Sequence, residues 1–347
     1  MASADRRPRR LLILAEGRSG DPHYGKTARG VMRYRPDDVV ALVDSERPGE
    51  TEAGFPVVAT VAEGMHYDPT VALVGVATQG GRFPPAWRDL LMDAVRAGLD
   101  VENGLHEFLT ADAELVALAA EHGVELRDLR KPPRGLNVPT GANLTHSAKT
   151  ILTVGSDCAI GKMTVSLELD REARRRGLRS EFVPTGQTGI AIAGWGISVD
   201  AVVADFIAGA AEQLVLEGVA RGGEVLFVEG QGSVLHPAYS GVTLGLIHGS
   251  APHGFVLCHK VGERFVDENE RFPMPPLSEL AALHRRLSLL ARPADVHAIA
   301  LNTRDLDERA ARRSIEEAEA EAGLPADDPV RFGAAKLIDA LAPILER

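Results

Sequence analysis

A short apolar strand that runs directly into a glycine-bounded loop constrains the fold of this chain more than any other feature. Residues 150–155 read TILTVG, and a helix is expected from about Gly161 to Arg176. A helix amino terminus with a lysine attracts anions, because its unpaired N–H groups and partial positive charge add to the lysine charge. We expect this loop to bind the phosphates of a nucleotide-like cofactor through Gly155, Ser156, Asp157, Cys158, Ala159, Ile160, Gly161, Lys162, Met163 and Thr164.

The loop departs from the usual pattern G-x-x-x-x-G-K-[ST] at two places. Five residues separate Gly155 from Gly161, and Met163 stands where a hydroxyl would hold magnesium in nucleotide triphosphatases. A thioether is a poor ligand for magnesium, which prefers hard oxygens. Either Thr164 takes that place, or the bound phosphates need no metal. The spacing of histidines and cysteines fits no zinc site, so no metal site is assigned to them.

A second strand of the same half ends in VEGQGS, with Glu229 at the strand end and glycines behind it. Ligands of parallel sheets lie beyond the carboxyl ends of the strands, so Glu229 is expected to face the phosphate loop as a magnesium ligand or general base. The alternative is a carboxylate that caps the next turn. His236 is a second candidate for proton transfer. A nucleophilic role for Cys158 in the loop is a further alternative.

Substrate contacts are predicted from polar residues near these strand ends and from one basic helix. The segment PTGQTG (184–189) follows a strand, and its hydroxyl and amide groups are candidates to orient a substrate carboxylate. Turn formation and a solvated helix face are the alternatives. The predicted substrate-binding residues are Thr185, Gln187, Thr188, Gln231, Ser233, Lys26 and Arg29.

The first half of the chain alternates apolar strands with amphipathic helices. Such alternation predicts a parallel sheet covered on both faces, which is a Rossmann-like domain. No G-x-G-x-x-G follows the first strand, so dinucleotide binding is not predicted there. Strands are expected at 11–15, 39–45, 55–61 and 70–77, and helices at 26–34, 87–97 and 111–122.

Residues 127–145 are rich in Pro, Gly and Asn, as linkers are. We therefore expect a Rossmann-like domain over 1–135 and a P-loop NTPase-like α/β domain with a mostly parallel sheet over 136–347. In the second domain, strands are expected at 150–155, 179–186, 224–232, 254–260 and 296–302, and helices at 161–176, 199–222, 278–291, 306–321 and 334–346.

Composition excludes several classes of function. The net charge of -11 argues against nucleic-acid binding, which needs a basic face. No apolar run reaches the length of a membrane span, and the start MASADRRPRR precedes too few apolar residues for a secretory signal, so we read it as a short tail. Two cysteines make no disulfide framework. We expect a cytoplasmic homo-oligomer that acts on a small molecule.

Six segments together resemble one family: GSDCAIGKMT (155–164), PTGQTGI (184–190), VDAVVADFIAGAAE (199–212), VEGQGSVLHPAYSGVTLGLIHG (228–249), KTARGVMRY (26–34) and GLDVENGLH (98–106). This family was long a domain of unknown function, and members are described as D-glutamate N-acetyltransferases. The resemblance implies transfer of an acetyl group from acetyl-CoA to the amine of D-glutamate or a similar acidic amino acid.

A more distant resemblance is to dethiobiotin synthetase-type enzymes with a phosphate-binding loop. Their loop has the same spacer as Gly155 to Lys162, and their strand end resembles Glu229 to Gly232. Asn302 resembles the position that contacts adenine in those enzymes, while Met163 departs from their magnesium-binding threonine. This resemblance leaves open an ATP- and magnesium-dependent kinase or ligase acting on a carboxylate. A nucleotide-binding regulatory protein without turnover is a third possibility.

Overall fold

The computed structural model describes residues 8–21, 25–76, 81–84 and 87–346, which pack as two α/β units. The first unit extends as far as Pro132 and also includes Gln187–Trp195, while the second holds 133–186 and the chain from Gly196 onward. The sequence predicted one boundary, after residue 135, and two continuous domains. The return of Gln187–Trp195 to the first unit corrects that expectation of continuity.

The first unit is built on a sheet of seven strands in the order β3-β4-β2-β1-β5-β6-β7. All neighbouring pairs are parallel except β3 with β4. The side chains of β1 are fully buried, as expected for a central strand covered on both faces. The strands are β1 (Leu11–Leu14), β2 (Val39–Val43), β3 (Thr51–Glu52), β4 (Phe55–Val58), β5 (Val71–Val74), β6 (Asp100–Asn103) and β7 (Leu126–Asp128).

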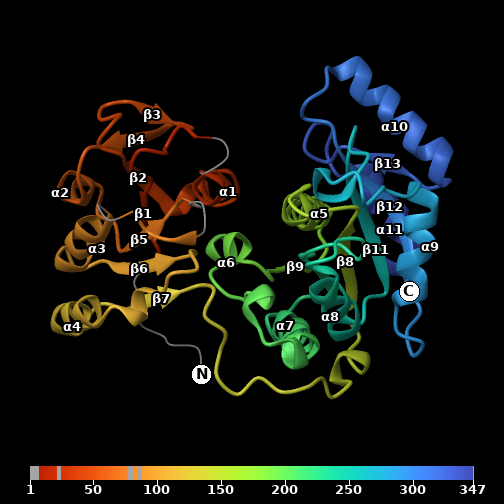
Figure 1. Ribbon diagram of the computed structural model, residues 1–347, viewed down its shortest axis with the longest axis horizontal. Coiled ribbons are helices and arrows are strands. Elements are labelled where there is room, and N and C mark those ends of the chain that lie inside the picture. Colours follow the sequence, from red (N-terminus) through yellow and green to blue (C-terminus); the bar gives the residue numbers. More distant parts are fainter. Residues whose placement is uncertain (1–7, 22–24, 77–80, 85–86, 347) are drawn as a thin grey trace. The chain divides into compact units, whose positions relative to one another are not determined.

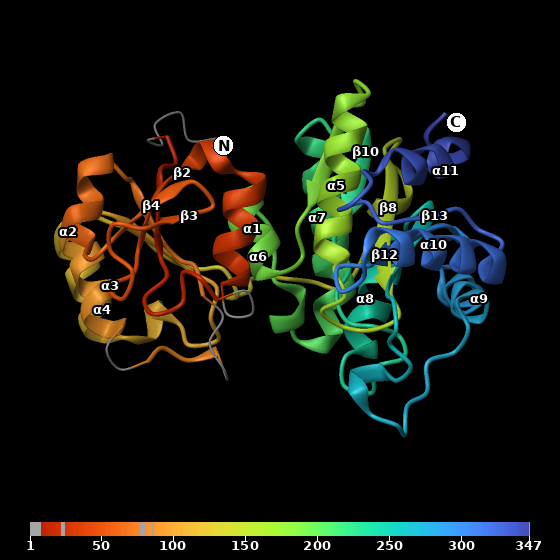
Figure 2. The same cartoon turned by 90° about the horizontal axis from the view of Figure 1, so that it is seen from above.

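Helices cover both faces of this sheet. Figures 1 and 2 show α2, α3 and α4 on one face, and α1 beside α6 on the other. The helices are α1 (Lys26–Tyr34), α2 (Val61–Gly64), α3 (Trp87–Arg96), α4 (Ala113–His122) and α6 (Gln187–Ala193). The Rossmann-like class predicted from the alternation of strands and helices is confirmed.

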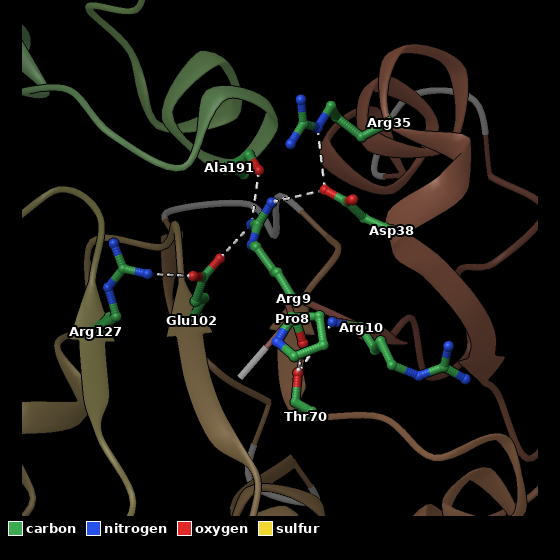
Figure 3. Close-up of polar contacts among 9 residues, drawn as sticks. All are labelled: Pro8, Arg9, Arg10, Arg35, Asp38, Thr70, Glu102, Arg127 and Ala191. Carbon is green, nitrogen blue, oxygen red and sulfur yellow. Dashed lines mark hydrogen bonds and ion pairs between the residues drawn. The ribbon is translucent and has the colours of Figure 1, made fainter. Parts of the chain in front are cut away.

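Two polar contacts fix α6 within the first unit, although its sequence lies in the second half of the chain. The hydroxyls of Thr27 and Thr188 are 3.0 Å apart and buried. Arg9 donates from Nη2 to the carbonyl of Ala191 at 2.7 Å and to the buried carboxylate of Glu102 at 2.6 Å (Figure 3). Arg127 binds the other oxygen of Glu102, also at 2.6 Å. Glu102 is therefore paired on both sides, as a buried carboxylate requires.

The second unit is built on six parallel strands in the order β13-β12-β11-β8-β10-β9. This central position of β8 places the loop that follows it between the ends of β11 and β10. The strands are β8 (Lys149–Gly155), β9 (Ser180–Val183), β10 (Val225–Val228), β11 (Gly254–Lys260), β12 (Asp295–Asn302) and β13 (Ala326–Asp327).

Helices again cover both faces of the second sheet. The core of one face joins the sheet to the apolar sides of α5 and α11, through Ile151, Leu169, Phe227, Ala298 and Leu341 among others. The helices of the unit are α5 (Lys162–Arg175), α7 (Ile207–Ala220), α8 (Ser240–Ser250), α9 (Leu277–Leu287), α10 (Glu308–Ala322) and α11 (Ala335–Leu345). Among the described residues, no helix is long and apolar enough to cross a membrane.

The helix predicted over 199–222 is shorter in the structure. Val199–Ala201 and Ala204–Phe206 form 3₁₀ turns, and the α-helix begins only at Ile207. The Ser198 hydroxyl bonds the Asp200 carboxylate at 2.7 Å, and Val202 has extended backbone angles. Local side-chain bonds and β-branched residues both compete with an α-helix here.

Several other expectations differ from the structure at element ends. Val61 was expected in a strand but begins α2, because Thr60 caps that helix by accepting the N–H of Glu63. The expected strands 179–186 and 224–232 end at Val183 and Val228. The structure adds β3, β6, β7, β13, α6 and α8, which were not predicted. Residues 1–7 of the expected tail and Ala77 lie outside the described residues.

Two histidines, the buried His284 and the half-buried His253, predict acid sensitivity. Burial lowers the pKa of His284 in α9 and of His253 before β11 to about 4. Both folded pKa values lie below the unfolded value of about 6.5, so the unfolded chain binds more protons between pH 6.5 and 4. The free energy of unfolding should therefore be intact above about pH 6.5 and fall as the pH drops toward 4.

Urea unfolding of the wild type at a series of pH values measures this loss. We expect His284→Met to reduce the dependence of unfolding free energy on pH in this window by about 1 kcal/mol or more. The exposed His122 provides the matched substitution, His122→Met, which should leave the dependence unchanged. Equal pH dependence in His284→Met and wild type would contradict the assignment.

Candidate active site

The predicted phosphate loop lies between β8 and α5 and has a tightly defined backbone. Ala159 has a φ of 53° and Gly161 a φ of 117°, and no atom lies within 4 Å of a Cβ built on Gly161. Lys162 begins α5, is 6% exposed, and donates from Nζ to the Asp157 carbonyl at 2.6 Å. The lysine charge and the helix amino terminus are thus together at one end of the loop, as an anion site requires.

Side chains from neighbouring strands and turns form hydrogen bonds with the loop. The buried hydroxyl of Ser156 lies 2.9 Å from Nδ1 of His259, and burial lowers the pKa of that histidine. Ser233 donates its hydroxyl to the Ser156 carbonyl at 3.0 Å and is itself fully buried. Asn302 donates to the Ile160 carbonyl at 3.1 Å. In this structure Ser233 and Asn302 therefore support the loop backbone.

Gly230 allows β10 to approach the strand beneath the loop. Its N–H donates to the Thr153 hydroxyl at 3.0 Å, and a Cβ on it would lie 1.8 Å from the Thr153 carbonyl. No side chain fits at that distance. Gly230 in turn places the preceding residue, Glu229, beside the loop.

Glu229 is 4% exposed and has three defined donors. Its Oε2 accepts the N–H groups of Thr185 at 2.9 Å and Gly186 at 3.1 Å, and its Oε1 accepts Nε2 of Gln231 at 3.2 Å. The Thr185 hydroxyl donates to the Glu229 carbonyl at 2.7 Å. These bonds fix the orientation of the carboxylate.

His236 comes from the loop before α8 and lies near the start of the phosphate loop. It is 5% exposed, and its Nδ1 accepts the N–H of Ala238 at 3.1 Å. In the neutral ring the proton is then on Nε2, which lies 3.8 Å from Oδ2 of Asp267. This tautomer makes His236 a hydrogen-bond donor at Nε2, and less suited to the role of base than Glu229.

The predicted substrate residues fall into two groups. Thr185, Gln231 and Ser233 lie in the second unit, around Glu229 and the loop. Gln187 and Thr188 begin α6 in the first unit, whose α1 carries the exposed side chains of Lys26 and Arg29. Arg29 faces Glu52 at 3.7 Å. The sequence did not indicate this division, because it depends on where α6 packs.

Residues outside the predicted set also surround the loop. Asp157 accepts the N–H of Asp267 at 2.6 Å through Oδ2, which attaches the turn before α9 to the loop. Burial raises the pKa of Cys158, partly opposed by the charge of Lys162. Burial also raises the pKa of Glu263. No local pattern marks Asp267 or Glu263, since they are distant in sequence from the loop.

The fold and the loop define the class: a two-unit α/β protein with a Rossmann-like unit and a phosphate-loop unit. Residues 137–338 match the family model described as "Domain of unknown function (DUF1611_C) P-loop domain". Residues 45–132 match "Domain of unknown function (DUF1611_N) Rossmann-like domain". The chain belongs to the DUF1611 family, as its motifs indicated.

Similar proteins support this membership over nearly the full length. A protein of Tritonibacter scottomollicae named D-glutamate N-acetyltransferase is 35% identical over 96% of this chain and 98% of its own length. One of Pseudoalteromonas sp with the same name is 33% identical over 80% of this chain and 83% of its own. The crystal structure of a DUF1611 family protein from Anabaena variabilis has a TM-score of 0.88 at 40% identity, covering 96% and 99%. These relatives indicate a transferase.

Proposed function

We propose that the protein transfers an acetyl group from acetyl-CoA to the amine of D-glutamate. The observation that carries the proposal is its 35% identity, over 96% of the chain, to a protein named for this reaction. The phosphate loop is compatible with a donor that carries a pyrophosphate and is not cleaved at phosphorus, because Met163 follows Lys162 in the first turn of α5, where a magnesium-binding hydroxyl is usual.

In this proposal, Lys162 and the loop amides bind the phosphates of coenzyme A. Lys162 would exchange its contact with the Asp157 carbonyl for a phosphate oxygen. Oε1 of Glu229 accepts a proton from the substrate ammonium, and the free amine attacks the thioester carbonyl. The C–S bond breaks, and the thiolate of coenzyme A leaves and takes up a proton. Main-chain N–H groups near the glycine loops are the donors for the developing oxyanion.

The side chains of Thr185 and Gln231 remain the proposed contacts for the substrate in the second unit. Gln187, Thr188, Lys26 and Arg29, which belong to the first unit, remain predictions from the sequence. Positive side chains such as Lys26 and Arg29 are suitable partners for a dicarboxylate, since charge-assisted bonds to carboxylates are stronger than neutral ones.

Release of coenzyme A thiol tests this function. Purified protein is mixed with acetyl-CoA and, in turn, D-glutamate, L-glutamate and D-aspartate, in buffer without added magnesium or ATP. We expect thiol release with D-glutamate above that with the other two acceptors. Thiol release with none of them, together with ATP- and magnesium-dependent phosphate release, would favour the kinase or ligase instead.

The role of Glu229 gives a separate prediction. Glu229→Gln keeps the size of the side chain and removes the proton acceptor, so we expect kcat to fall by about 10²–10⁴-fold. Glu181→Gln is the matched substitution at a partly exposed glutamate on β9 that pairs with Arg174, and should leave kcat within about twofold. Unchanged kcat in Glu229→Gln would remove Glu229 as the base.

A further inference from the structure

A cluster of three different metal-ligating side chains lies at the phosphate loop. Donor atoms of Asp157, Cys158 and His236 all lie within 4.8 Å of one another. Asp157 and His236 are 6% and 5% exposed, whereas Cys158 is partly exposed. Two donors are thus held in the interior and the third lies toward solvent.

We propose that Asp157, Cys158 and His236 bind a borderline-soft divalent cation, of which Zn²⁺ is the representative. A thiolate, an imidazole and a carboxylate are the donor types that zinc takes, and the thiolate disfavours magnesium and calcium. Zinc bonds of about 2.0–2.3 Å place tetrahedral ligands about 3.5 Å apart. Donor atoms within 4.8 Å therefore need only side-chain adjustments of about an ångström to reach a common ion.

The surroundings of two of the ligands suit this role. Both carboxylate oxygens of Asp157 accept backbone N–H groups, from Cys158 at 2.6 Å and from Asp267 at 2.6 Å, which orient the carboxylate and leave lone pairs for an ion. Such outer contacts are usual around metal-ligating carboxylates. The carboxylate of Asp267 lies 3.8 Å from Nε2 of His236 and is 77% exposed, so it is free to move toward the ion as a fourth ligand.

Coordination through Nε2 of His236 requires one rearrangement. Its Nδ1 now accepts the N–H of Ala238, so the neutral ring carries its proton on Nε2. Binding at Nε2 moves the proton to Nδ1 and releases the Ala238 N–H. We therefore expect the Ala238 amide to exchange its hydrogen faster in the metal-bound protein.

This site would hold a cation at the loop, where the thioether of Met163 is a poor ligand for magnesium. Three protein ligands leave a fourth position of a tetrahedral ion for Asp267, water or an oxygen of the bound ligand. The sequence offered no zinc pattern, because Asp157 and Cys158 are adjacent while His236 comes from a distant loop. The proposal concerns ion binding alone and does not depend on acetyl transfer.

Titration of the metal-free full chain with Co²⁺ alone, followed by Zn²⁺, tests the site. We expect one ion per chain, a near-ultraviolet thiolate-to-cobalt band, and loss of that band on addition of Zn²⁺. Cys158→Ala should abolish the band and weaken Zn²⁺ binding by at least about tenfold. Cys258→Ala is the matched control and should keep both, because Cys258 is buried in the core and its thiol pKa is raised to about 12.

Three results would contradict the proposed metal site. A band that persists in Cys158→Ala, a band lost in Cys258→Ala, or a Zn²⁺ dissociation constant above about 1 mM for the wild type would overturn the proposal. Should Cys158→Ala not fold, His236→Gln keeps the sulfur and must still weaken Zn²⁺ binding by at least about tenfold. Because no acetyl-CoA or amino acid is present, failure here leaves the acetyl-transfer proposal untouched, and its failure leaves this one untouched.

Discussion

Replacing Lys162 with methionine is expected to lower kcat/KM for acetyl-CoA by about three orders of magnitude, or about 4 kcal/mol. The lysine is 6% exposed and supplies the full positive charge at the amino terminus of α5. Methionine fills the same space but leaves the phosphates with backbone donors alone. Steady-state kinetics and direct measurement of acetyl-CoA binding should show the loss in both KM and affinity.

Lys336→Met is the matched control for this substitution. Lys336 is on α11, pairs with Glu319 at 2.8 Å and is 43% exposed. Lys336→Met removes one positive charge, as Lys162→Met does. It should leave kcat/KM within about twofold of the wild-type value, because exposed ion pairs contribute little to stability. Equal acetyl-CoA affinity in Lys162→Met and wild type, with the fold intact, would show that the loop does not bind the donor.

Gly230→Ala is expected to destabilise the protein by about 4 kcal/mol or more, the range of a severe steric conflict. The added Cβ would lie 1.8 Å from the Thr153 carbonyl, so β10 and β8 must separate at the loop. This separation would also break the hydrogen bond from the Gly230 N–H to the Thr153 hydroxyl. Urea unfolding followed by circular dichroism measures the change.

Gly241→Ala is the control for the same chemical change. Gly241 is exposed within α8, and no atom lies within 4 Å of a Cβ at that position. Alanine there should be neutral or stabilise by up to about 1 kcal/mol, since glycine is the poorer helix former. If Gly230→Ala were as stable as Gly241→Ala, the close packing of β10 on β8 would be wrong.

The local order of strands, loops and helices could be predicted from the sequence because each signal is short-range. The apolar run before Gly155 marked β8, and Gly161-Lys162 marked the start of α5. The helix over Lys26–Tyr34 and the strand over Gly254–Lys260 were predicted with the bounds observed. The two α/β folds follow from this alternation, and the structure confirms them.

The rest depends on contacts between distant residues. The small residues of α6 gave no periodic signal, and its place in the first unit rests on Thr27 and Arg9, far away in the chain. The same holds for the cluster at the loop, where His236 approaches Cys158 only after folding. The alternative for Glu229 was a carboxylate that caps the turn after it, whereas the backbone N–H groups that it accepts come from Thr185 and Gly186, in the loop after β9. Whether Glu229 is in addition a base remains the prediction made above.

The central claim is tested most directly by the product. The full chain is incubated with D-glutamate and acetyl-CoA carrying ¹³C in the acetyl group, and the products are separated on a chiral column and identified by mass spectrometry. We predict labelled N-acetyl-D-glutamate, formed in equal amount to free coenzyme A and about a thousandfold more slowly with Lys162→Met. Free coenzyme A without any labelled N-acetyl amino acid, or unchanged product from Lys162→Met, would contradict the account.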